Sequence, residues 1–117
     1  MRVEEFYSIL GGNYEDVLSR LGKTERIVKY LRKFADSEEC GSIDGFLESE
    51  NYEEAFRAVH SIKGMCMNLG LSKLQESSST LCEELRNGKP QIDVTDMLAK
   101  VKSDFAQATD AIRQIED

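Results

Sequence analysis

Residues 51–70 read NYEEAFRAVHSIKGMCMNLG. Asn51 and Glu54 form a capping-box-like pair, which is typical of a helix start, and Gly70 is typical of a helix end. Between them, apolar residues recur at steps of four and three, the spacing of one face of an α-helix. These residues are Ala55, Val59, Ile62, Cys66 and Leu69. The stretch therefore predicts an amphipathic helix with one buried face.

The same periodicity continues on both sides of this helix. Downstream, Ser72 and Gln75 make a second capping-box-like pair, opening a helix that should close at Gly88. Its stripe is Leu74, Ser78, Leu81 and Leu85. The last helix should follow Asp93 as its N-cap. It has the longest stripe: Val94, Leu98, Val101, Phe105, Ala108, Ile112 and Ile115.

Upstream, residues 24–35 and 42–50 are expected to be two pieces of one broken helix, and residues 3–10 and 14–21 to be short helices. Short connections force neighbouring helices to run antiparallel. The sequence therefore predicts an all-α fold, an antiparallel up-down four-helix bundle with short N-terminal capping helices. We expect a single domain over 1–117, with residues 1–22 as the cap and 23–117 as the bundle.

Composition narrows the classes of function. The 117 residues carry a net charge of -7, which disfavours a nucleic-acid partner. No apolar run approaches the roughly 20 residues of a membrane span, and the first residues do not resemble a signal peptide, so we expect a cytoplasmic protein with no membrane role. Cys40, Cys66 and Cys82 lack a Cys-x-x-Cys spacing, and there is one histidine. No metal site, disulfide framework or cofactor of the chain's own is therefore expected.

The single histidine, His60, is the strongest candidate for chemistry. On a helical wheel Lys63 lies about 60° to one side of it and Gly64 about 40° to the other, while the apolar stripe points roughly 140° away. His60 should therefore face outward, with a cation one turn away and no side chain at Gly64. Glycine inside a helix costs about 1 kcal/mol relative to alanine, so it calls for a packing or access reason. An accessible imidazole is a usable nucleophile near neutral pH.

Other interpretations compete with a reactive histidine. Most isolated surface histidines are inert, and only the combination with Lys63 and Gly64 raises His60 above them. The hydroxyl groups of residues 77–80 have no histidine or aspartate arranged to activate them. A reactive thiol at Cys82 is a minor alternative. No glycine-rich phosphate loop is present, so any phosphoryl group must come from a partner.

The pattern His-x-x-Lys-Gly, followed by a second glycine six residues later, resembles the histidine-containing phosphotransfer (HPt) domain family. Here it consists of His60, Lys63, Gly64 and Gly70. The resemblance covers roughly residues 14–90 and is strongest over 51–72. It implies a phosphocarrier, not an enzyme. The phosphoryl group would pass between His60 and the aspartate of a response-regulator receiver domain, or come from a sensor histidine kinase.

The resemblance also implies roles for the neighbouring residues. Lys63 would offset phosphate charge and Gly64 would leave room for the receiver, which would hold the Mg²⁺. We expect the docking surface to comprise Phe56, Arg57, Met67, Cys82 and Arg86. Several family members have a glutamine 22 residues after the histidine, where this chain has Cys82. A thiol is a poor hydrogen-bond donor, so Arg86 or Ser79 could partner the imidazole instead. An Arg86 side chain that only faces solvent is an equal alternative.

Two further hypotheses stay open. The same helical face could serve a non-catalytic interaction module in which His60 is incidental. Alternatively, the chain is the phosphoacceptor domain of a chemotaxis-type histidine kinase, separated from its catalytic part. A monomer is expected, and Met1 with the short cap favours a small free-standing protein over an excised domain.

Overall fold

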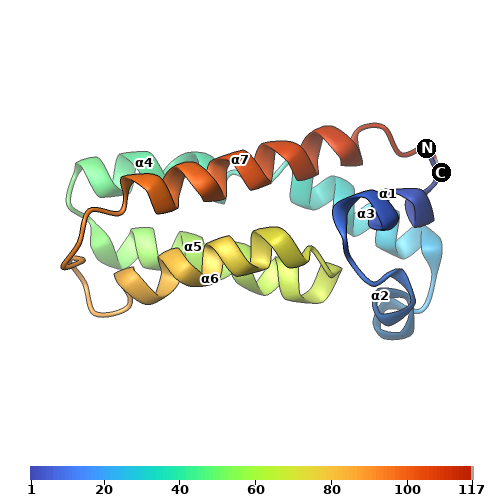
Figure 1. Cartoon of the computed structure of the whole chain (residues 1–117), viewed down its shortest axis with the longest axis horizontal. Helices are drawn as coiled ribbons and strands as arrows, with labels where there is room; N and C mark the ends of the chain where they lie inside the picture. Colours follow the sequence, from blue (N-terminus) through green and yellow to red (C-terminus); the bar gives the residue numbers. More distant parts are fainter. Residues whose placement is uncertain (117) are drawn as a thin grey trace.

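The computed structural model describes residues 1–116, and within that range every regular element is an α-helix (Figure 1). The elements are α1 (Val3–Leu10), α2 (Tyr14–Leu21), α3 (Thr24–Ala35), α4 (Glu39–Glu48), α5 (Tyr52–Leu69), α6 (Ser72–Leu85) and α7 (Thr95–Ile112). The all-helical prediction is therefore confirmed. Among residues 1–116, no helix combines the length and the apolar character that crossing a membrane requires.

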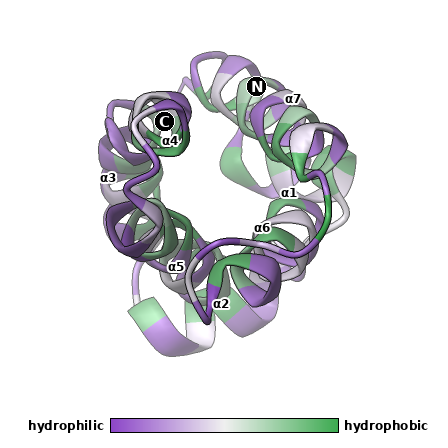
Figure 2. Ribbon diagram, turned by 90° about the vertical axis from the view of Figure 1, so that its left-hand side faces the viewer, coloured by the Kyte–Doolittle hydropathy of each residue, from purple (hydrophilic) through white to green (hydrophobic). Residues whose placement is uncertain are grey.

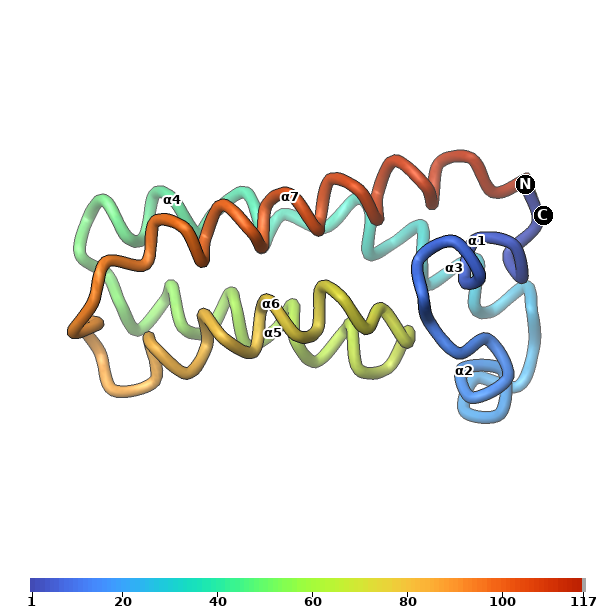
Figure 3. Tube along the Cα trace, in the orientation of Figure 1, coloured from blue at the N-terminus to red at the C-terminus, as the bar shows by residue number. Residues whose placement is uncertain are grey.

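The longer helices lie side by side along the molecule (Figures 1 and 3). α3 and α4 follow one another along one side, and α5, α6 and α7 each run opposite to the preceding segment. Viewed along the molecule, these segments surround a common centre (Figure 2). Helices α1 and α2 lie near one end of the long axis (Figure 1). The two chain ends meet at that same end, where the Glu116 amide donates to the Met1 carbonyl at 2.8 Å.

The interruption between α3 and α4 is a short local turn. Ser37 donates from its hydroxyl to the Phe34 carbonyl at 2.6 Å, which satisfies one carbonyl at the end of α3. The chain becomes helical again at Glu39, earlier than the predicted residue 42, and Cys40 joins the core at 4% exposure. α4 then ends at Glu48, before the left-handed Glu50 at φ 59°. The expectation of one helix broken into two pieces agrees with this arrangement.

The predicted apolar stripes of α5 and α6 belong to the hydrophobic core. Every stripe residue of both helices is buried. The stripe of α7 is less completely buried. Val94, Leu98 and Phe105 are only half-buried and pack against the edge of the core. The polar residues buried alongside the stripes are Ser77, Ser78, Asp104 and Thr109.

The capping predictions are confirmed for α5 and wrong for the start of α6. Asn51 does cap α5, since its side chain accepts from the Glu54 amide at 3.4 Å, and Gly70 closes the helix at φ 67°. The capping box predicted at Ser72 and Gln75 is wrong. Ser72 is already helical, and the N-cap position is held by Leu71, which is 2% exposed. Burial of the leucine therefore decides where this helix begins.

The last two predicted boundaries shift by a few residues. α6 ends at Leu85, before the predicted Gly88, which lies in the following turn at φ 95°. Val94 holds the N-cap position of α7, one residue after the predicted Asp93. The Asp93 carboxylate nevertheless accepts from the Thr95 amide at 2.9 Å and from its hydroxyl at 2.6 Å. These bonds lower the pKa of Asp93.

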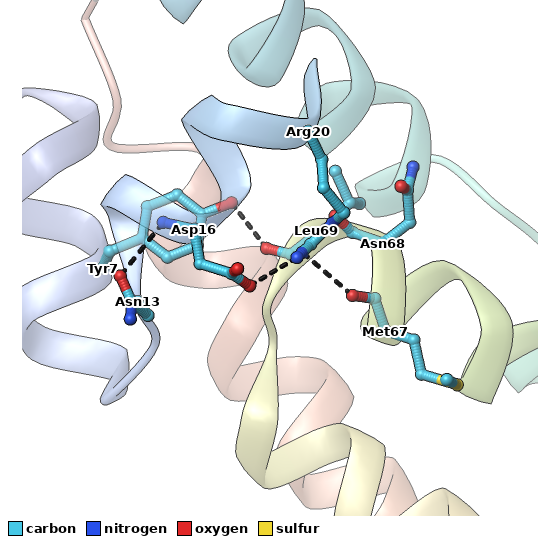
Figure 4. Close-up of polar contacts among 7 residues, drawn as sticks. All are labelled: Tyr7, Asn13, Asp16, Arg20, Met67, Asn68 and Leu69. Carbon is cyan, nitrogen blue, oxygen red and sulfur yellow. Dashed lines mark hydrogen bonds and ion pairs between the residues drawn. The ribbon is translucent and has the colours of Figure 1, made fainter. Parts of the chain in front are cut away.

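Helices α1 and α2 are joined to the C-terminal end of α5 by hydrogen bonds (Figure 4). The buried Tyr7 hydroxyl donates to the Leu69 carbonyl at 2.6 Å. Arg20 donates to the carbonyls of Met67 at 3.1 Å and Asn68 at 3.0 Å. The last carbonyls of a helix have no partner within the helix. The N-terminal helices therefore satisfy and hold the end of the helix that carries His60.

Candidate functional site

His60 lies at the middle of α5 and its side chain is exposed. Val59 and Ile62 on either side of it are both fully buried. The 3.6-residue period therefore turns one face of α5 into the core and leaves His60 on the other. The sequence-based expectation that the imidazole faces outward agrees with this position.

The inner edge of the imidazole contacts a thiol. His60 Nδ1 lies 4.0 Å from the Sγ atom of Cys82 on α6. Cys82 itself is fully buried, and burial raises its pKa, although the charges of Lys63 and Arg86 act in the opposite direction. The thiol is therefore protonated at neutral pH and offers only a weak polar contact. Within residues 1–116, Nδ1 is the ring nitrogen that has a polar neighbour.

One face of the imidazole stacks on an aromatic ring. The ring centres of Phe56 and His60 are 5.6 Å apart and the ring planes are inclined by 19°. The guanidinium carbon of Arg86 lies 5.6 Å from the centre of the Phe56 ring, within cation–π range. Arg86 also donates to Glu83 at 2.6 Å, and this bond lowers the pKa of Glu83. Arg86 thus lies over Phe56, while Cys82 makes the polar contact with the imidazole.

Lys63 supplies positive charge next to the histidine. Its ammonium group lowers the pKa values of both Cys82 and Glu83, so its charge acts toward α6. No carboxylate of residues 1–116 forms an ion pair with it, and the side chain is half-buried. Arg57, by contrast, is held by Glu53 and Glu54, each at 2.8 Å. Of the two cations predicted beside His60, Lys63 is the less neutralised.

The glycine beside the histidine has no packing role among residues 1–116. A Cβ atom built on Gly64 would meet no atom within 4 Å. The possibility that glycine is needed for the approach of a neighbouring helix is therefore removed. One turn along, Met67 is 53% exposed. Gly64 and Met67 together leave an open apolar area beside the imidazole.

One sequence-based assignment changes, and the sequence analysis assigned no role to one residue that contributes to the site. Cys82 was expected on the docking surface, but a fully buried thiol has no area to offer a partner. It lies beneath His60 instead. Glu83, which was not singled out, is the residue that orients Arg86. The Glu-x-x-Arg spacing places two opposite charges one helical turn apart, and this spacing was the available signal.

The hydroxyl groups of Ser77, Ser78 and Thr80 on α6 donate to backbone carbonyls. Ser78 is fully buried and donates to the Leu74 carbonyl at 2.6 Å. Ser77 donates to the same carbonyl at 3.3 Å. These contacts agree with a packing role for small residues. Over residues 1–116, no three histidine, cysteine, aspartate or glutamate side chains gather in a group that could hold a metal ion.

All three cysteines should resist thiol reagents in the folded protein. Cys40, Cys66 and Cys82 are at most 4% exposed, and burial raises the pKa of each, to about 12 for Cys66. Since the thiolate is the reactive form, we expect Ellman's reagent at pH 8 to label the native protein at least about 100-fold more slowly than the denatured one. Fast labelling of one thiol in the native state would revive the reactive-cysteine alternative.

Comparison with known proteins agrees with the site. A model of the Hpt domain family matches residues 29–116. No curated protein and no solved structure matches the chain. The match includes all of α4 to α7, and so extends past the range of 14–90 expected from the motif, but it omits α1 and α2. It covers well over half of the chain, with His60, Lys63 and Gly64 inside it. The chain therefore belongs to the Hpt domain family, the phosphotransfer domains of two-component signalling.

Proposed function

We propose that this protein is a phosphocarrier whose His60 is reversibly phosphorylated. In this proposal it relays the phosphoryl group to and from receiver aspartates in a multistep two-component phosphorelay. The observation that carries the proposal is the open surface around an exposed imidazole, next to a cation that forms no ion pair with a carboxylate of residues 1–116.

The two ring nitrogens of His60 would have different roles in phosphoryl transfer. Nδ1 is turned toward Cys82, which supports Nε2 as the reacting nitrogen. The Nε2 lone pair attacks the phosphorus of a receiver's aspartyl phosphate. The P–N bond forms as the P–O bond to the carboxylate breaks, and the carboxylate leaves with its electron pair. The proton stays on Nδ1, next to the sulfur. The reverse reaction charges the next receiver.

The receiver would supply most of the electrostatic stabilisation that phosphoryl transfer needs. A phosphoryl group in transfer carries negative charge that must be stabilised electrostatically. Lys63 would supply part of that stabilisation, and Mg²⁺ bound to the receiver would supply most of it. We expect a transient interface with a buried area at the small end of the usual range. In this proposal the chain acts in the cytoplasm as a monomer, and its fold is an up-down four-helix bundle. Phe56, Met67, Arg57 and Arg86 would line it.

Phosphotransfer from charged receivers tests the proposal. Receiver domains encoded in the same genome are phosphorylated with acetyl phosphate and Mg²⁺ and mixed with the wild type or with His60→Gln. We expect the wild type to gain one phosphoryl mass that is lost in acid, and the variant to gain none. If every receiver leaves the wild type unmodified, the proposal is wrong, and an interaction module becomes the better description. Phosphorylation only by a kinase's ATP-binding domain would favour a phosphoacceptor domain.

Lys63→Ala should slow transfer without unfolding the protein. Removing the ammonium takes away one stabilising charge next to the phosphoryl group, and we expect the transfer rate to fall about tenfold, equivalent to about 1.4 kcal/mol in the barrier. Rapid-quench transfer assays give the rate, and thermal unfolding gives the stability. Lys63→Arg, which keeps the charge, should recover most of the rate. A large loss of melting temperature in Lys63→Ala would mean that Lys63 has a structural role instead.

A further inference from the structure

Positive charge is concentrated in one short segment of this acidic protein. Residues 20–33 contain six of the 15 lysines and arginines and a single acid, Glu25, so the segment has a net charge of +5. The rest of the chain therefore has a net charge of -12. All six cationic side chains are exposed. The segment comprises the end of α2 and most of α3.

Part of this segment borders the helix that carries His60. Tyr30 and Lys33 of α3 line a depression of about 240 Å³, together with Met65 and Asn68 of α5. The Lys33 ammonium lies over the Tyr30 ring, 6.0 Å from its centre. Asn68 is exposed and lies one turn beyond Gly64. The surface around His60 thus continues across α5 onto α3.

Arg20 extends the same surface from α2. It forms an ion pair with Asp16 and also donates to the carbonyls of Met67 and Asn68 (Figure 4). These contacts hold the guanidinium beside the exposed Met67. Arg20 lies outside the residues that the family model matches. We call Arg20, Tyr30 and Lys33 the α2–α3 flank.

The chemistry of the α2–α3 flank favours an acidic protein as its partner. A long polyanion such as a nucleic acid, or an anionic membrane, would also face the charge of -12 spread over the rest of the chain and be repelled. A folded protein can place a local cluster of carboxylates against the flank. The aromatic ring of Tyr30 and the neighbouring Met65 and Met67 also offer apolar contact, which protein interfaces use at their core.

We propose that the α2–α3 flank is a specificity-determining extension of the His60 docking surface. It selects a receiver domain that carries a cluster of carboxylates beside its phosphorylation site. The inference rests on the proposed function, since it assigns the receiver as the partner. Complementary charge at the rim of an interface acts mainly on the association rate and on the choice of partner.

The test separates binding from phosphotransfer by using His60→Gln as the background. Receiver domains encoded in the same genome are tested for binding to this protein, and the association rate is measured with and without Lys33→Glu. We expect Lys33→Glu to lower the rate about fivefold at low ionic strength. The difference should shrink as salt rises above about 0.15 M, because the Debye length falls. Lys29 lies four residues before Lys33, so the new carboxylate has an i,i+4 partner and the helix should remain stable.

Lys89→Glu is the matched control. Lys89 is exposed in the loop after α6, which borders the other end of α5 near Tyr52, and the charge change is identical. The α2–α3 flank would be refuted as a docking element if Lys89→Glu and Lys33→Glu changed the association rate equally, or if neither changed it. A complete absence of receiver binding would refute it as well. Receiver binding that depends on Lys33, without phosphoryl transfer to the wild type, would leave the flank intact and reject the relay.

Discussion

Gly64→Gln is expected to reduce phosphotransfer from receivers at least about 100-fold while the protein becomes slightly more stable. The glutamine would stand beside His60, where the structure leaves open space, and would hold a docked receiver away from the imidazole. A displacement of about 1 Å from the reacting geometry is enough for a loss of this size. Glutamine is also the better helix former, by roughly 0.5–1 kcal/mol. Transfer assays and thermal unfolding measure the two effects.

A small phosphodonor distinguishes blocked docking from a damaged histidine. Phosphoramidate needs no protein interface, so it should phosphorylate His60 in Gly64→Gln and in the wild type at similar rates. Gly45→Gln on α4 is the control, since Gly45 is also an exposed helical glycine with open space around it. It should leave both reactions unchanged. If Gly64→Gln received the phosphoryl group from receivers at the wild-type rate, the access role of Gly64 would be refuted.

Helix α5, which carries His60, was predictable because its signals are local. Asn51, Gly70 and the five apolar residues between them act within one helix, and the structure confirms its bounds and its buried face. The outward position of His60 follows from that periodicity alone. The start of α6 was not predictable in this way, because Leu71 is buried by tertiary contacts and the serine that follows never becomes a cap.

The environment of the imidazole required three-dimensional information. The resemblance to the HPt family, some members of which have a glutamine 22 residues after the histidine, implied that Cys82 lies near His60. The sequence could not decide whether Arg86 reached the ring instead. The structure separates them: Arg86 is bound to Glu83 and lies over Phe56, and the thiol contacts Nδ1. Likewise, the contacts of Tyr7 with Leu69 and of Arg20 with Asn68 join residues 62 and 48 positions apart. No local pattern encodes such pairs.

Gly12→Ala is expected to destabilise the protein by about 3 kcal/mol, a large effect for one methyl group. A Cβ atom at this position would overlap severely with the Gly70 carbonyl oxygen and lie 2.8 Å from Cδ1 of Tyr7. Gly12 does not have a positive φ, so the requirement for glycine is spatial. We expect the melting temperature to fall by about 10 °C, as measured by circular dichroism.

Neither neighbour of Gly12 can move aside cheaply. The Gly70 oxygen belongs to the backbone of the turn that ends α5 at φ 67°, and a Cβ on Gly70 would itself lie 2.5 Å from Val17. Tyr7 is 1% exposed and its hydroxyl is bound to Leu69, so the ring is fixed at both ends. Gly41→Ala on α4, where a Cβ meets nothing within 4 Å, should instead stabilise by up to about 1 kcal/mol. If both alanine variants unfolded at the same temperature, α1 and α2 would not be packed against α5, and Arg20 would not be held on the α2–α3 flank.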